Sequence, residues 1–134
     1  MKKALRFLAL SLVLVTILAS LASCGGPAKD PADALAALKE NEYVAAEDKL
    51  IVPTALKLVG VDGIDSVVSG TATIDKKVEH VTIIYFEDKD AANDAWEKVE
   101  KYATDNKKDD SDWVVKKSGA MIYYGTTAGI KAAK

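Results

Sequence analysis

The sequence predicts an α+β protein in which helices pack on an antiparallel sheet of about four strands. Two runs rich in β-branched residues flank the polar stretch Asp75–Lys77, a pattern typical of a β-hairpin. A long segment with helical periodicity follows, and two further β-rich runs lie on either side of Ser118 and Gly119. The core order is therefore strand–strand–helix–strand–strand, preceded by N-terminal helical material.

The N-terminal part of the domain is expected to contain two helices. Asp30 is suited to cap the first helix, and Pro31 to occupy its first position, where the missing N–H costs nothing. A second short helix is expected over 53–59, closed by Gly60. The helical period is lost over 43–46, where a short strand fits. The apolar residues that share one face of the first helix are Ala34, Leu35 and Leu38.

The central hairpin is expected to join strands over 67–75 and 78–87. In its second strand Val81, Ile83 and Tyr85 share one face. The alternate residues, on the other face, are His80, Thr82, Ile84 and Phe86. Because both faces carry apolar groups, this strand is predicted to lie in the middle of the sheet.

A helix is expected to follow from about Lys89 to Asp105, with Asp88 as its cap. Strands are then predicted over 113–115 and 121–124, and Thr126 or Thr127 is suited to cap a short terminal helix. The apolar stripe of the long helix consists of Ala92, Ala95, Trp96, Val99 and Ala103.

We expect the helices to cover one face of the sheet. Tyr123 and Tyr124 point to opposite faces, so at most one of them can serve the same core. An uncovered face would present a patch for a partner or a second subunit. The candidate residues of that patch are Ile84, Phe86, Val114 and either Tyr123 or Tyr124.

The first residues have the layout of an export signal. Lys2, Lys3 and Arg6 precede an apolar run over 7–19, and small residues lead up to Cys24. The apolar run is shorter than the roughly 20 residues that a membrane-spanning helix needs. We therefore expect the chain to be exported rather than held by a transmembrane helix.

The stretch Leu21-Ala22-Ser23-Cys24 resembles the bacterial lipoprotein signal. The resemblance implies cleavage between Ser23 and Cys24, a diacylglyceryl thioether on Cys24 and often an acylated N-terminus. Residues 1–23 would then be a cleaved signal peptide, residues 24–30 a lipidated tether and residues 31–134 a single small domain. The expected location is the extracytoplasmic side of a membrane, with the lipid bilayer as partner through acylated Cys24.

Cysteine and charge content agree with this interpretation. Cys24 is the single cysteine, so the exported domain forms no internal disulfide; its position disfavours the alternatives of a nucleophile or a free thiol. Residues 25–29 have the composition of a flexible tether. The formal charge of −2 becomes more negative once Lys2, Lys3 and Arg6 are removed. Arg6 is also the single arginine, so nucleic-acid binding is not expected.

Candidate catalytic and metal-binding residues give no recognised motif. His80 is the single histidine, and a general base would need a partner such as Asp75, because Glu79 points to the opposite face. We interpret it as a structural strand histidine. Asp105, Asp109, Asp110 and Asp112 lack the EF-hand pattern and are expected to form a solvated loop.

Other motifs are also missing from the sequence. Ser111 and Ser118 lie in no nucleophile motif, and the glycines at 60 and 63 do not form a phosphate loop. We therefore expect no catalytic residues, no metal and no cofactor.

Residues 85–92 and 113–119 look like segments of small uncharacterised lipoproteins of Gram-positive bacteria, a resemblance that carries no activity. The leading hypothesis is a non-catalytic interaction or accessory module with an envelope protein partner. The alternatives are binding of a small ligand in a concave apolar site, inhibition of an envelope enzyme, and a hydrolase that uses His80. The type of cell envelope stays open.

Overall fold

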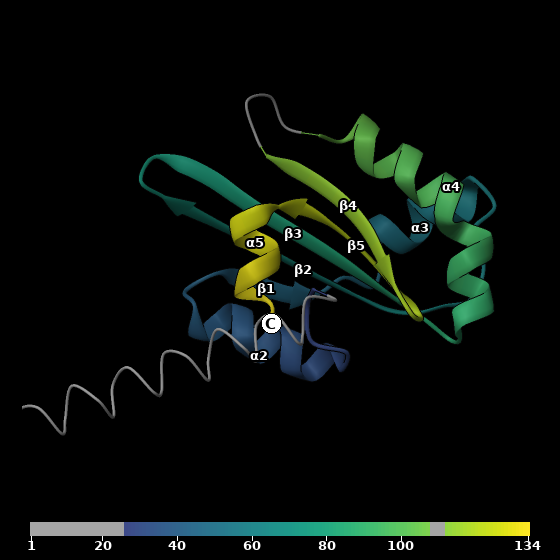
Figure 1. Cartoon of the computed structure of the whole chain (residues 1–134), viewed down its shortest axis with the longest axis horizontal. Coiled ribbons are helices and arrows are strands. Elements are labelled where there is room, and N and C mark those ends of the chain that lie inside the picture. Colours follow the sequence, from purple (N-terminus) through teal and green to yellow (C-terminus); the bar gives the residue numbers. More distant parts are fainter. Residues whose placement is uncertain (1–25, 108–111) are drawn as a thin grey trace, which may run out of the picture.

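The computed structural model describes residues 26–107 and 112–134, which form a five-stranded antiparallel sheet with four helices (Figure 1). The strand order is β1-β2-β3-β5-β4. The strands are β1 (Val44–Glu47), β2 (Ile64–Ile74), β3 (Lys77–Phe86), β4 (Trp113–Ser118) and β5 (Met121–Thr126). The helices are α2 (Pro31–Glu40), α3 (Ile51–Leu58), α4 (Lys89–Asp105) and α5 (Thr127–Ala132). The predicted α+β class is confirmed. The sheet contains β1 in addition to the four strands of the predicted strand–strand–helix–strand–strand core.

The central strand is the one that the sequence predicted. β3 pairs with β2 on one side and with β5 on the other. Val81, Ile83 and Tyr85 belong to one buried cluster, whereas Ile84 and Phe86 belong to another on the opposite face. The alternation of side chains along this strand thus divides the hydrophobic core in two.

Helices cover both faces of the sheet, so the expectation of one covered face is wrong. α2 and α5 pack on the face of Ile83, and α3 and α4 pack on the face of Ile84. Figure 1 shows α3 and α4 together at one end of the molecule, apart from α2 and α5. Ile84 and Phe86, candidates for an open patch, are buried. These two side chains are covered by α3 and α4, while α2 and α5 form a second helical layer on the opposite face.

The helix caps follow the sequence. The Asp30 carboxylate accepts a hydrogen bond from the Ala32 N–H, the Asp88 carboxylate accepts one from Ala91, and the Thr126 hydroxyl accepts one from Gly129. The second helix begins at Ile51, two residues earlier than expected. No helix of the described residues has both the length and the apolar character that crossing a membrane requires.

Residues 26–29, which were expected to form a flexible tether, lie against the folded domain. Pro27 is buried, and the backbone of Ala28 forms a hydrogen bond to Ala133 at the C-terminus. Residues 24 and 25 of the predicted tether lie outside the described residues.

Candidate functional site

A groove lies on the sheet face that α3 and α4 cover only in part. The row formed by Val67, Ile84 and Ile122 across three strands is buried beneath these helices. The next two rows extend beyond the helices and line a cavity of about 640 Å³. These rows are Ala46–Ser69–Thr82–Tyr124 and Val44–Thr71–His80. Most side chains in these two rows are small, so they leave open space above the sheet at the base of the groove.

The floor carries a connected set of polar groups. His80 Nδ1 lies 3.2 Å from the Thr71 hydroxyl, and His80 Nε2 lies 2.8 Å from the Thr82 hydroxyl. The Ser69 hydroxyl lies 3.3 Å from that of Thr82. The register explains this arrangement, because Thr71 is paired with His80 and Ser69 with Thr82. A hydroxyl can donate and accept, so the network can adapt to either kind of ligand group.

Tyr124 extends the network onto β5. Burial raises the pKa of Tyr124 well above its ordinary value, although its hydrogen bond with Thr82 acts in the opposite direction. The phenol is therefore protonated at neutral pH, and it is buried at the base of the groove. The ring of Tyr102, from α4, meets that of Tyr124 edge-on, with centroids 6.4 Å apart.

Trp113 forms an aromatic wall at one end of the groove. Its ring is parallel to that of His80 within 4°, with centroids 5.9 Å apart. Its indole N–H donates to the carbonyl of Ala103 at 3.0 Å, in the last turn of α4. A ring fixed at both its face and its nitrogen is preorganised for contact with a ligand.

The start of α3 forms the opposite wall. The Asp48 carboxylate accepts hydrogen bonds from the N–H groups of Leu50, Ile51 and Val52 at 3.0, 2.8 and 2.9 Å. Partial burial alone would raise the pKa of Asp48, but these three donors outweigh it and lower the pKa below its ordinary value. Val44 and Ile51, which are 84% and 75% exposed, give this rim an apolar surface.

His80 is one of the residues that line the groove. Its two ring nitrogens face threonine hydroxyls, and Glu79 is buried on the other face, as its position in the strand predicted. Asp75 lies in the turn of the hairpin, with a positive φ of 51°. The sequence therefore identified a residue of the site but not its surroundings.

The acidic loop is not brought together as a cation site in the described residues. Asp105 is the last residue of α4 and is exposed. The Asp112 pKa is lowered, chiefly by the hydrogen bond from the Thr127 hydroxyl. Asp109 and Asp110 lie outside the described residues, and in the part that is described no three His, Cys, Asp or Glu side chains gather to hold a metal ion.

Several other predicted residues lie apart from the groove. Ser118 ends β4, and the glycines at 60 and 63 flank the turn that leads from α3 to β2. Ser111 lies outside the described residues, as do the predicted signal peptide, the cleavage position after Ser23 and the lipidation site Cys24.

The hydroxyl residues of the floor were not predicted from the sequence. Ser69, Thr71 and Thr73 alternate along β2, and this repeat of small polar side chains on one face of an inner strand was the available signal. Trp113 was noted as a strand residue, but its contact with His80 joins segments distant in sequence.

The comparisons give no relative from which a function could be transferred. No family model, no curated protein and no solved structure matches the chain.

The lining disfavours an anionic ligand. Among the described residues that line the groove, none is Lys or Arg, the side chains that usually bind carboxylates and phosphates. Glu47 and Asp48 lie at one side, so an anion would meet unfavourable charge. Aromatic and aliphatic walls above a hydroxyl floor suit a mostly apolar molecule that carries a hydrogen-bonding group.

Proposed function

We propose that this protein is an extracytoplasmic lipoprotein, anchored through Cys24, that binds a small, mostly apolar and non-anionic ligand without catalysis. The observation that carries the proposal is the groove, whose apolar and aromatic walls rise above the hydroxyl groups of Ser69, Thr71 and Thr82. Its volume of about 640 Å³ lies within the range of sites for small molecules, roughly 300–1,000 Å³.

The anchor is supported by the sequence at the N-terminus. A basic start, a short apolar run and the Leu21–Cys24 stretch together resemble a lipoprotein signal. Two acyl chains would give stable membrane binding, at about 0.8 kcal/mol for each buried methylene. Mass spectrometry of the native protein tests this part, with the expected result that the chain starts at Cys24 and carries a diacylglyceryl group.

Ligand binding in the groove is tested by filling the groove with a larger side chain. Thr71→Trp places a large ring on the floor, whereas Thr73→Trp is a matched control because it lies two residues further along the same face of β2, outside the groove lining. We expect a small molecule to be purified with the wild-type protein and with Thr73→Trp, but not with Thr71→Trp. Native mass spectrometry of protein purified from cell envelopes measures this.

The control also defines what would contradict the proposal. If Thr71→Trp retains the same bound mass as the wild type, the groove is not the site. If the wild type carries no small molecule and binds none from an envelope extract, ligand binding is not the function.

Helix α3 favours a second candidate, an interaction or accessory module with a protein partner. Large apolar side chains on and beside this helix are exposed, and they are Leu50, Ile51, Leu58 and Val59. Clustered exposed apolar groups are typical of protein interfaces. Crosslinking in intact cells should capture an envelope protein with the wild type but not with Leu58→Lys if this candidate is correct.

A further inference from the structure

The N-terminal segment is fastened to the sheet face opposite the groove. The Ala28 N–H donates to the Ala133 carbonyl at 2.9 Å, and the Tyr85 hydroxyl donates to the Ala28 carbonyl at 2.7 Å. Pro27, between Ala28 and the predicted anchor, is buried. Tyr85 belongs to the core beneath α2 and α5, whereas the groove lies beyond α3 and α4.

Gly26 continues this attachment toward the anchor. Its φ of +93° lies in a region that side chains disfavour. A Cβ atom at this position would also collide with the ring of Tyr123, which lies on the same face as Tyr85. The chain therefore passes directly over the sheet at Tyr123, and only glycine fits this path without strain.

We propose that the side of the molecule formed by α5 and the start of α2 faces the lipid bilayer, so that the groove faces away from it. This inference rests on the proposed lipidation of Cys24. Only Gly25 lies between Cys24 and Gly26. A chain spans at most about 3.6 Å per residue, so the Cα atom of Cys24 must lie within roughly 7 Å of that of Gly26, which keeps the lipidated side chain close to this face. The anchor would thus act as a short clamp.

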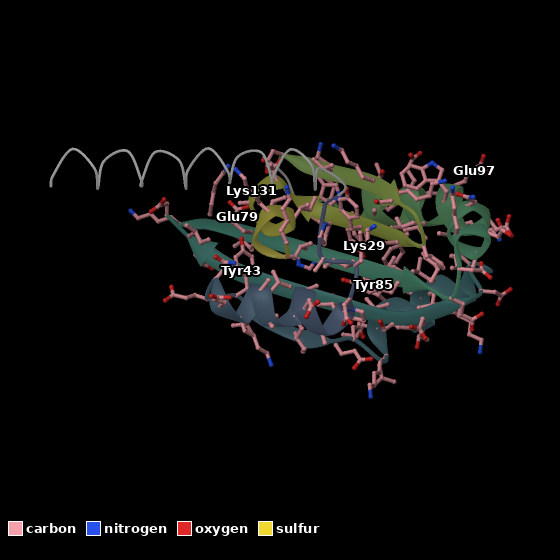
Figure 2. The ribbon with its side chains drawn as sticks, turned by 60° about the horizontal axis from the view of Figure 1, so that its bottom comes forward. Lys29, Tyr43, Glu79, Tyr85, Glu97 and Lys131 are labelled. Carbon is pink, nitrogen blue, oxygen red and sulfur yellow. The ribbon has the colours of Figure 1, made fainter. Side chains whose placement is uncertain are left out.

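Charges on this side are mixed. Lys29, Lys131 and Lys134 are exposed near the segment and can contact anionic headgroups, and Figure 2 labels the first two. Asp30 and Asp33 lie close enough to Tyr85 to raise its pKa further, after the larger effect of burial. These carboxylates offset part of the attraction, so the short clamp rather than charge sets the orientation.

The orientation has a consequence for the groove. Its opening would face the aqueous space outside the membrane, with the sheet and a helical layer between it and the lipid. The ligand is therefore expected to arrive from that space rather than from the bilayer.

Single cysteine labels test the orientation. Lys131→Cys places a fluorophore on exposed α5, and the matched variant Glu97→Cys places it on exposed α4. Figure 2 shows Glu97 at the right-hand end of the molecule and Lys131 left of its centre, well apart along the long axis. The native lipidated protein is reconstituted in vesicles of phosphatidylcholine and phosphatidylglycerol that contain a nitroxide-labelled lipid. We expect strong quenching at position 131 and little quenching at position 97.

A linker variant provides the control. Insertion of about 20 Gly and Ser residues after Gly25 releases the clamp, since such chains are flexible coils, and should lower quenching at position 131 toward that at position 97. Equal quenching at the two positions in the short-linked protein would overturn the orientation. A native protein without a lipid on Cys24, found by mass spectrometry, would overturn the anchor instead, so the two failures are distinguishable.

Discussion

Asp48 stabilises the start of α3 and also lines the wall of the groove. Its carboxylate accepts hydrogen bonds from three backbone N–H groups at the start of α3. We expect Asp48→Ala to lower the free energy of unfolding by about 0.5–2 kcal/mol, the usual cost of losing a helix cap. Urea denaturation at pH 7 measures this, and an unchanged midpoint would contradict it.

The same residue predicts a pH dependence. Because the folded-state pKa of Asp48 lies below its ordinary value of 3.8, the ionised carboxylate stabilises the fold. This contribution is fully present above the unfolded-state pKa and is lost as the pH falls through the folded-state pKa. The stability difference between the wild type and Asp48→Asn should therefore shrink as the pH is lowered from about 5 toward 3. A difference that stays constant over this interval would disprove the assignment.

At the scale of residues, the sequence allowed some caps to be predicted and not others. Asp30 and Asp88 directly precede their helices and were recognised. Asp48 was not, because the presence of Pro53 suggested a helix start two residues after the real one at Ile51. Proline is tolerated throughout the first turn of a helix, so it marks the start only to within a few residues.

The turn between β2 and β3 is an element whose stability can be improved. Asp75 and Lys76 have positive φ values of 51° and 65°, the conformation of a two-residue type I′ turn. At the second turn position a residue other than Gly or Asn is strained by the positive φ. Lys76→Gly should therefore raise the free energy of unfolding by about 1 kcal/mol. Thermal denaturation followed by circular dichroism measures the change.

A matched substitution distinguishes the effect of the turn conformation on stability from the effect of losing a positive charge. Lys77→Gly lies one residue later, at the start of β3, where a glycine weakens a strand. It removes the same charge and should be neutral or destabilising. If both variants stabilise the protein equally, the effect comes from charge and not from the turn.

At the scale of elements, the hairpin and its central position could be predicted because they depend on local alternation of side chains. The groove could not, because it depends on how far α3 and α4 extend over the rows of the sheet. The side chains of Ser69 and Thr71, which stay accessible, could equally have been covered by a helix, and only tertiary packing decides this.

At the scale of the whole molecule, the sheet joins two hydrophobic cores into one folding unit. Leu38 is fully buried between α2 and the sheet, and Leu56 is fully buried between α3 and the sheet. Each substitution by alanine should lower the free energy of unfolding by about 2–5 kcal/mol. The two side chains are matched in size and burial but lie on opposite faces, so they probe the two cores separately.

The two hydrophobic cores are expected to unfold cooperatively. β2, β3 and β5 contribute side chains to both cores, so neither face can unfold while the other keeps its sheet. Both tryptophans, Trp96 and Trp113, pack against the core beneath α3 and α4. We therefore expect Leu38→Ala, on the opposite face, to shift the tryptophan fluorescence transition and the circular dichroism transition to the same denaturant concentration. A fluorescence transition that stays at the wild-type midpoint, while circular dichroism changes earlier, would show that the two cores unfold independently.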